Sequence, residues 1–523
     1  MARLAAPAPG SRRLYALCLH FAVGASIWGY NIGVLSSILV HPGWRAALGS
    51  PSASQRGVVT AVYYVGTFVS YVALAHPLAD WLGRRRAALV GTGVLCVGAG
   101  LMAGAGAGAG PARAALGVTV FGRLVCGLGA GMVSTTVPLY QSEVSPAKER
   151  GKFVTMNHVG FITGLATGLW VGYGMTFWTG PRGDYWGWRV SMLLQLAPAI
   201  FFAAGLLFVP ETPRWLVQKG RPELAARVLD RLREGTGPPG ATAAELAAMR
   251  ADVEARPARD SAALALFRRP MLRARLWRAF ALQFMAQLCG ATAIKYYLPT
   301  LLRALGLSTR LALMAGAIEM TAKIGMTVVE MWAIDALGRR ACLVGGCLVM
   351  GVSMLINGVL PLAYPGNVNK AADAACIAFI FIYAMGYSLG LGPAAWVYSS
   401  EIFPTSVRAR GLNLAASGGA IGSIIVAQIW PVGVANLGSR IYFFFMAVNL
   451  LCAPIIWFLY PETKGRALED MDDLFGKSVP RHAAVPSDPA TTVAHRTRPH
   501  GAGGDVTQSS SQHSAEEGAQ LLR

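Results

Sequence analysis

The chain has 523 residues, of which 54% are hydrophobic and only 14% are charged, and its mean hydropathy is +0.45. Because soluble globular proteins carry about 25% charged residues, this composition excludes an ordinary soluble protein and indicates a chain embedded mostly in a lipid bilayer. The net charge of +20 would suggest nucleic-acid binding in a soluble protein. Here the basic residues lie between apolar segments, where they act as orientation signals, so no nucleic-acid partner is expected.

Twelve apolar segments are each long enough to cross a bilayer as a helix, which takes about 20 residues. In chain order they span about 14–40, 57–78, 87–110, 115–139, 153–178, 188–209, 276–303, 310–334, 341–363, 374–398, 412–432 and 440–460. The first is longer than the core of a signal peptide, so we expect it to remain in the protein. The sequence therefore predicts an all-α membrane protein with twelve transmembrane helices.

The charged connections predict sidedness and domain organisation. Basic residues gather in the loops after the even-numbered segments, at 84–86, 148–152, 339–340 and 408–410. By the positive-inside rule these loops and both termini are predicted to be cytoplasmic, in a multi-pass protein of the plasma membrane. We expect a short N-terminus (1–13), a six-helix bundle (14–209), a central cytoplasmic loop (210–275), a second six-helix bundle (276–460) and a largely disordered tail (461–523).

The two halves repeat each other. DWLGRR at 80–85 returns as DALGRR at 335–340, SEVSPAKER at 142–150 as SEIFPTSVR at 400–408, and PETPR at 210–214 as PETKG at 461–465. Three unrelated motifs recur in the same order with offsets between 251 and 258 residues. Two related six-helix bundles with a site between them are typical of an alternating-access transporter.

These motifs, together with GYNIGV at 29–34, GRLVCGLGAG at 122–131, QLCG followed by YYLPT at 287–300, and GPAAW at 392–396, resemble the sugar porters of the major facilitator superfamily. The resemblance covers residues 14–475 and is strongest to fungal members. It implies the major facilitator fold and transport of a monosaccharide, polyol or sugar acid by a monomeric unit.

The resemblance also implies cytoplasmic salt-bridge clusters that hold the halves together when the site faces outward. Such pairs are individually weak when hydrated, which suits a gate that opens in every cycle. The expected gating residues are Asp80, Arg84, Arg85, Glu143, Arg150, Glu211, Asp335, Arg339, Arg340, Glu401, Arg408 and Glu462. One departure is His76, which replaces the glycine that usually begins the first motif.

Polyhydroxy solutes are recognised by amides, which donate and accept hydrogen bonds, and by aromatic faces. By family position Gln287 and Trp396 match sugar contacts, and Gln283 lies one helical turn from Gln287. Other usual contacts have changed, and the residues now present are Ala286, Thr292, His158 and Gly419-Ala420. We therefore expect a site that differs from a plain hexose site.

Energy coupling has two open interpretations. Proton-driven relatives carry an aspartate in the first-helix motif, whereas this chain has Asn31, which cannot hold the proton, opposite the retained Arg123. Asn31 favours facilitated diffusion. His158 and Glu330 are the other deep titratable candidates for proton symport.

Lys323 lies twelve residues before Asp335, about 18 Å along a helix and hence near mid-membrane, where relatives have an asparagine. An ionised side chain at that depth costs roughly 3 kcal/mol, so it needs a partner. Lys295 and His158 are expected around the same cavity, which would favour a solute with a carboxylate, such as a sugar acid or quinate-like acid. Alternatively, Lys323 pairs internally with Glu330, about 10.5 Å further along the same helix face.

Three classes of function remain to be compared. A transporter explains the duplication, the gates and the polar mid-membrane residues together, whereas a non-transporting nutrient sensor could share the same motifs. An enzyme is not expected, because the sequence contains no nucleophile-base pair or metal cluster. The eight cysteines lie in apolar segments without metal-ligand spacing, so we expect packed thiols, no metal and no cofactor.

Overall fold

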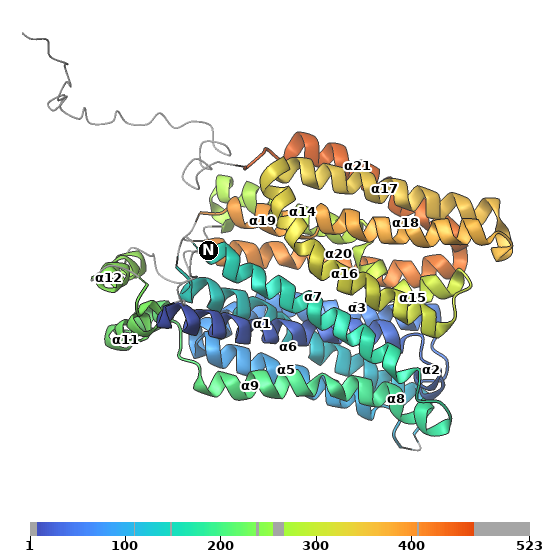
Figure 1. Ribbon diagram of the computed structural model, residues 1–523, viewed down its shortest axis with the longest axis horizontal. Coiled ribbons are helices and arrows are strands. Elements are labelled where there is room, and N and C mark those ends of the chain that lie inside the picture. The colour runs from blue at the N-terminus through green and yellow to red at the C-terminus, as the bar shows by residue number, and fades with distance from the viewer. Residues whose placement is uncertain are drawn as a thin grey trace, which may run out of the picture. The chain divides into compact units, whose positions relative to one another are not determined.

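The computed structural model describes residues 8–108, 110–146, 149–236, 240–254, 266–404 and 407–464, all within one compact unit. The predicted disorder of the tail after residue 464 concerns residues outside this set. Every regular element assigned in the described residues is a helix. Figure 1 shows the long helices running side by side, with the first half in blue and green and the second half in yellow and orange.

The first half contains α1 (Pro9–Ile38), α2 (Pro42–Ala47), α3 (Ala53–Val69), a π-helical turn (Ser70–Leu74), α4 (Ala75–Leu82), α5 (Arg84–Gly104), α6 (Ala112–Val144), α7 (Arg150–Met175), α8 (Pro181–Leu194) and α9 (Leu196–Phe208). The connection contains α10 (Pro213–Gln218), α11 (Pro222–Arg233) and α12 (Ala241–Glu254). The second half contains α14 (Pro270–Leu288), α15 (Ala291–Ala304), α16 (Thr309–Leu337), α17 (Arg339–Ala363), α18 (Lys370–Leu389), α19 (Pro393–Glu401), α20 (Arg408–Leu437) and α21 (Ile441–Leu459).

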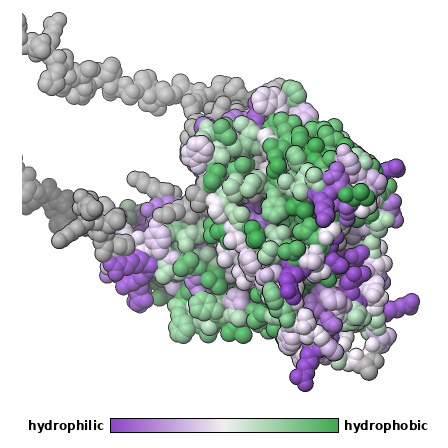
Figure 2. Space-filling view, turned by 45° about the vertical axis from the view of Figure 1, so that its right-hand side comes forward, coloured by the Kyte–Doolittle hydropathy of each residue, from purple (hydrophilic) through white to green (hydrophobic). Residues whose placement is uncertain are grey.

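Eight helical stretches of the described residues are long and apolar enough to cross a membrane. They cover nine of the twelve predicted segments, and α7, the α14–α15 pair and α16 occupy the other three. Figure 2 shows hydrophobic side chains over the middle of the visible face, with hydrophilic side chains gathered toward its ends. This distribution suits a bundle that is surrounded by lipid along its middle.

Several predicted spans are divided in the structure: 57–78 by a π-helical turn, 188–209 between α8 and α9, 276–303 between α14 and α15, and 374–398 between α18 and α19. The segment expected as a single helix at 276–303 divides into α14 and α15 at Gly290, whose φ of +108° is a conformation that glycine adopts readily. The carbonyl of Cys289 at the break accepts hydrogen bonds from the Tyr383 hydroxyl and the Asn449 amide, each at 2.9 Å. Because both donors lie within the protein, the break leaves no unsatisfied carbonyl facing lipid.

Glycines set the closest helix packing in the first half. A Cβ atom on Gly29 or Gly33 of α1 would lie 2.1 or 2.2 Å from a backbone oxygen of α7, at Phe161 and Leu165 respectively. Small residues let helix backbones approach closely inside a membrane. The glycines of the GYNIGV motif are therefore explained by the contact between α1 and α7.

In the described part of the chain, the main contacts between the halves join α3 and the π-helical turn after it with α20, α7 with α16, and α1 with α15. The first two pairs are related by the internal repeat, because α3 and α16 occupy equivalent places, as do α7 and α20. The interface between the halves therefore has the approximate two-fold symmetry that the repeated motifs predict.

Candidate functional site

A cavity of about 1920 Å³ lies between the halves, and its walls extend from mid-membrane residues to the D-x-x-G-R-R loops. Its deep part is lined by Lys295 and Lys323, and its outer part by Asp80 and Arg339. The cavity therefore runs from the centre of the molecule toward the end that carries the repeated basic loops.

Contacts between the halves lie toward the opposite end. The Tyr297 hydroxyl is 3.1 Å from Thr60 Oγ1, and the Gln428 amide donates to Ser54 Oγ at 3.2 Å. In addition, the Arg310 guanidinium donates to the Thr176 carbonyl at 3.2 Å. These contacts close one end of the molecule while the other end is open.

A basic and aromatic cluster occupies the deep part of the cavity. The ammonium groups of Lys295 and Lys323 lie 5.4 and 5.2 Å from the centroid of the Tyr387 ring. The Gln287 amide nitrogen donates to the Tyr387 hydroxyl at 3.2 Å, and its oxygen accepts from Lys295 at 3.5 Å. Two cations and an amide thus converge on one aromatic ring, a setting that can hold a carboxylate next to hydroxyl groups.

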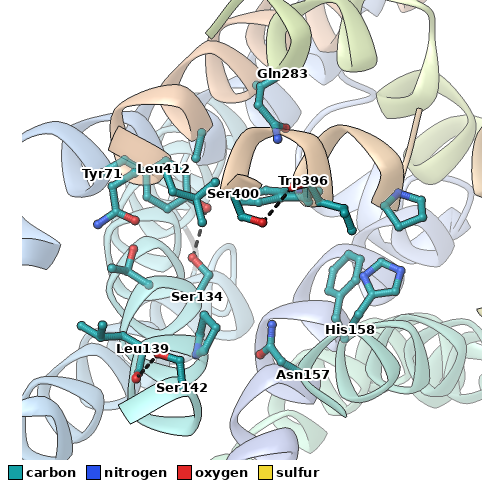
Figure 3. Close-up of a pocket in the computed structure, with 18 of the residues that line it drawn as sticks. Tyr71, Ser134, Leu139, Ser142, Asn157, His158, Gln283, Trp396, Ser400 and Leu412 are labelled. Atoms are coloured by element: carbon teal, nitrogen blue, oxygen red, sulfur yellow. Dashed lines mark hydrogen bonds between the residues drawn. The ribbon is translucent and has the colours of Figure 1, made fainter. Parts of the chain in front are cut away.

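Other predicted contact residues surround this cluster. Gln283, Trp396 and His158 all line the cavity. Figure 3 shows Gln283 and Trp396 reaching into it from one side, with His158 and Asn157 on the other. Trp396 is 43% exposed, and its ring faces the cavity.

Three of the residues predicted for substrate binding or coupling do not line the cavity. Thr292 is fully buried behind Gln287, to which its hydroxyl donates at 3.2 Å. Asn31 and Arg123 are also fully buried, and the Arg123 guanidinium donates to Asn31 Oδ1 at 2.6 Å. The same guanidinium donates to the Tyr296 hydroxyl at 3.3 Å, so this pair connects to the second half through a neutral group.

The internal partner proposed for Lys323 is not bonded to it. Glu330 lines the cavity and is 2% exposed, and its Oε1 has no hydrogen-bond partner. Glu319, one turn before Lys323, is 5% exposed, and its Oε2 also has no partner. Within the part of the chain that the structure describes, no ion pair joins Lys323 to either carboxylate. Glu319 and Lys323 share a small second pocket, which sequence reasoning missed.

The repeated loops form two equivalent ion-pair clusters. In the first half, Arg84 contacts Glu143 at 2.8 Å and Asp80 at 3.4 Å. In the second half, Arg339 contacts Glu401 at 3.0 Å and Asp335 at 3.2 Å. Each cluster lies within one half in this state, which is open at this end.

The glutamates of the two P-E-T boxes bind helix ends. Glu211 accepts from the backbone N–H groups of Arg84 and Arg85 at 3.0 and 3.2 Å. Glu462 accepts from those of Arg339 and Arg340 at 2.9 and 2.8 Å. A carboxylate at the N-terminus of a helix satisfies its free N–H groups and favours its dipole. Each box therefore fastens the start of the helix that follows a D-x-x-G-R-R loop.

The two capping glutamates titrate differently. Burial raises the pKa of Glu211, although backbone N–H donors oppose the shift. Burial also acts to raise the pKa of Glu462, but four backbone N–H donors, including that of Lys464, outweigh it and lower the pKa. The opposite signs follow because Glu211 is more deeply buried than Glu462 and has one backbone donor fewer.

The remaining gating predictions fall in three places. Arg408 lines the outer cavity, and its Nε donates to the Phe403 carbonyl at 3.3 Å. The Arg85 side chain donates to the Val209 carbonyl at 3.0 Å, and that of Arg340 lies over the Trp457 ring at 3.9 Å. Helix α7 begins at Arg150, whose side chain lies outside the described part of the structure.

One ion pair crosses between the halves at the open end. Arg410 of α20 lies 3.9 Å from Asp80 of α4, which also contacts His76 at 3.1 Å. His76, the departure noted in the first motif, therefore lies beside the only acidic group that this structure shows pairing with the opposite half among the described residues.

Two related groups of membrane-spanning helices, with a cavity between them that is open at one end and closed at the other, define an alternating-access membrane transporter. Residues 17–475 match the family described as Sugar (and other) transporter, and the chain belongs to that family. The predicted family, the major facilitator fold and the transport function are therefore confirmed, and the family is one of transporters, not enzymes.

Relatives and solved structures agree with this assignment. The quinate permease of Neurospora terricola is 30% identical over 489 residues, which cover 88% of this chain and 89% of that protein. The MFS-type transporter criB of Aspergillus cristatus is 30% identical over 455 residues, covering 87% of this chain and 91% of that protein. The partially occluded inward-open xylose transporter XylE from E. coli has a TM-score of 0.74 at 22% identity and covers 87% of this chain and 100% of that chain. This last likeness concerns the fold alone.

Proposed function

We propose that the protein moves a polyhydroxy acid, such as a sugar acid or a quinate-like acid, across the plasma membrane by alternating access. A single chain is the functional unit, because the cavity is built from the two halves of one chain. The D-x-x-G-R-R loops and both termini face the cytoplasm, as the positive-inside rule favours. In this orientation the cavity opens inward.

The observation that carries the substrate class is the pair of ammonium groups over Tyr387. Lys295 and Lys323 both reach this ring from different helices, and Lys323 has no ion pair among the described residues. A lysine held in the membrane without a counter-charge is costly, and a carboxylate on the solute would supply that charge. Gln283, Gln287 and Trp396 then serve hydroxyl groups and C–H edges.

The names of the relatives support an acid. Quinate permease of Neurospora terricola is named for the kind of acid that two lysines would recognise. The changed positions Ala286 and Gly419 remove hydrogen-bonding groups that relatives use for neutral sugars. A cavity with more positive charge and fewer amides suits an acid better than a hexose.

The clusters at Arg84 and Arg339 serve as the cytoplasmic gate in this proposal. In the inward-open state both arginines pair within their own half, and among the ion pairs of the described residues the one that crosses between the halves joins Arg410 to Asp80. Closure of this end would bring the two clusters together, so that their arginines share acidic partners. The contacts of Tyr297 and Gln428 at the opposite end would then open.

A panel of labelled solutes tests the proposal. Uptake of quinate, gluconate, glucose, xylose and a polyol is measured in transporter-deficient cells that express the protein, with and without a protonophore. We expect uptake of the acids to exceed that of the neutral solutes by about tenfold or more, because a charge-assisted hydrogen bond contributes about 1.5–3 kcal/mol. Cells with an empty vector are the control. Equal uptake of acids and neutral solutes would reject the acid, and no flux of any solute would reject transport.

A further inference from the structure

Most acidic residues that line the cavity have a basic partner. Four acidic residues line it in the described ranges, and three of them, Asp80, Glu143 and Asp335, pair with arginines near its mouth. Glu330 is the fourth. It is 2% exposed, has no ion pair, and leaves Oε1 without a hydrogen-bond partner. A buried carboxyl group that faces a cavity without a fixed partner is available to bind a proton.

The site on the first helix, formed by Asn31 and Arg123, cannot carry a proton. Asn31 carries an amide where a titrating carboxyl group would be needed, and Arg123 beside it is surrounded by neutral groups. Neither residue lines the cavity. Any proton that moves with the solute therefore needs another carrier.

Charge balance connects Glu330 to the solute. Lys323 and Glu330 lie on the same helix and line the same cavity, about 10.5 Å apart along its axis. In the empty site Glu330 and Lys323 face the same cavity without a direct ion pair, so an ionised Glu330 offsets the charge of Lys323 only at a distance. When a solute carboxylate pairs with Lys323, a second ionised carboxylate nearby has lost its counter-charge in surroundings of low polarity. Binding of one proton to Glu330 removes this unpaired negative charge at the lowest cost in free energy.

The groups around Glu330 allow this exchange. Helix α16 packs against α7, α15, α17 and α18. The titratable or charged residues that these elements and α16 itself place along the cavity or near Lys323 and Glu330 are Glu319, Lys323, Asp335, His158, Lys295, Arg339, Cys342 and Tyr387. Arg339 and Asp335 pair with each other, and Lys295 is bonded to Gln287. Lys323 is thus the cation whose counter-charge can change during the cycle.

We propose that Glu330 takes up one proton when the solute carboxylate binds to Lys323, and releases it when the solute leaves on the other side. The inference rests on the proposed function and adds the coupling ion and its carrier. The proton binds to a Glu330 carboxylate oxygen from the aqueous cavity, and no covalent bond of the solute changes. One anion and one proton cross together, so no net charge crosses the membrane.

Electroneutral coupling has a distinctive signature. A pH difference of one unit can raise the solute about tenfold inside, since one pH unit corresponds to a factor of ten in proton activity. A membrane potential without a pH difference should not raise the solute concentration inside. A facilitator of the anion alone would behave in the opposite way, with about tenfold for each 59 mV of potential.

The test uses the full chain in proteoliposomes with labelled quinate as the probe. Accumulation is measured with a pH difference at zero potential, and with a valinomycin–potassium potential at equal pH. Exchange is measured by counterflow, which needs no driving force. We expect wild type to accumulate quinate up to about tenfold with the pH difference only. Glu330→Gln should lose this accumulation and keep counterflow within about threefold of wild type.

Glu319→Gln is the matched control, because Glu319 is buried on the same helix but does not line the main cavity. It should keep pH-driven accumulation. A second readout needs no variant: adding quinate to wild type should alkalinise the medium by one proton per solute. Potential-driven accumulation in wild type, absent alkalinisation, or pH-driven accumulation that persists in Glu330→Gln would each overturn the inference while counterflow still supports transport. Absent counterflow in wild type would instead overturn the proposed function, and the inference with it.

Discussion

At the scale of single residues, Lys323 is the largest departure from a neutral sugar site. Its ammonium group shares the Tyr387 ring with Lys295, on a helix that relatives use for an asparagine contact. Two positive charges near one ring raise the free energy of the empty site, and a bound carboxylate would lower it. In the proposed function, Lys323 therefore sets the solute preference and forms no part of the gate.

Replacing this charge should change the solute preference. We expect Lys323→Asn to lower acid uptake by about tenfold to a hundredfold, the factor that loss of a charge-assisted bond of about 1.5–3 kcal/mol implies. Uptake of neutral sugars should stay the same or rise. The measurement is competition between labelled quinate and labelled glucose. Lys370→Asn, an exposed lysine at the start of α18, is the control. Unchanged acid preference in Lys323→Asn would contradict the assignment.

Residue partners were predictable only where the sequence repeats them. The pairs of Arg84 with Glu143 and Arg339 with Glu401 follow from two copies of the same motifs. Tyr387 belongs to no motif, so nothing in the sequence marked it as the ring between the lysines. Glu319 also belongs to no repeated motif, so nothing in the sequence marked it as a neighbour of Lys323.

At the scale of elements, the two P-E-T boxes fasten helices α5 and α17. Both glycines that precede these helices have positive φ, at +96° for Gly83 and +94° for Gly338. A Cβ atom at either position would lie 2.3 or 2.7 Å from the capping carboxylate. The glycine of each D-x-x-G-R-R loop is therefore needed both for its backbone angle and for the approach of the cap.

The two caps should respond oppositely to acid. The native pKa of Glu462 lies below its usual value of 4.5, so its contribution to stability is present above pH 4.5 and is lost as pH falls through the native pKa. The native pKa of Glu211 is raised, so its contribution is present below pH 4.5 and is lost as pH rises through the native pKa.

Substitution of each cap checks this difference. Glu462→Gln should destabilise the protein by about 1 kcal/mol at pH 7, a typical value for a lost helix cap, and the difference from wild type should shrink toward pH 4. Glu211→Gln should lower the stability of the protein less than Glu462→Gln does at pH 7. Apparent melting temperatures in detergent across this pH range are the measurement. An equal loss for both variants at every pH would contradict the opposite signs.

Helix positions were predicted well because long apolar runs leave little choice in a bilayer. The breaks within these helices were not predicted. The division at Gly290 depends on donors from Tyr383 and Asn449, which lie on other helices far along the chain. Such a break is visible only once the tertiary structure supplies those donors.

At the scale of the whole molecule, hydrogen bonds between the halves hold the closed end, and a long ion pair between Arg410 and Asp80 crosses the open end in the described part of the chain. The repeat in the sequence predicts two halves, yet the same sequence serves every state of the cycle. Which end is closed therefore follows only from contacts such as those of Tyr297 and Gln428.

A covalent cross-link across the closed end should stop transport but leave substrate binding intact. Ser54→Cys combined with Gln428→Cys places two thiols where the native side chains lie 3.2 Å apart. After treatment with a short bifunctional thiol reagent, counterflow of quinate should fall to background, while binding from the open end should remain. Each single variant is the control, and a reducible reagent should allow recovery. Undiminished counterflow in the cross-linked protein would contradict opening at this end.

The P-E-T caps have a consequence for the speed of the cycle. Main-chain bonds to Glu211 and Glu462 anchor the helix ends, so the guanidinium groups of Arg84 and Arg339 are free to exchange partners without loosening the helices. In the proposed gate, the work of each turnover is then confined to side-chain contacts. The pairs of Arg339 are partly exposed, and exposed pairs contribute about 0–1 kcal/mol each, whereas the pair of Arg84 with Glu143 is buried and costs more to separate. Such a gate would open and shut by exchange of side-chain partners, while the helices that carry it stay intact.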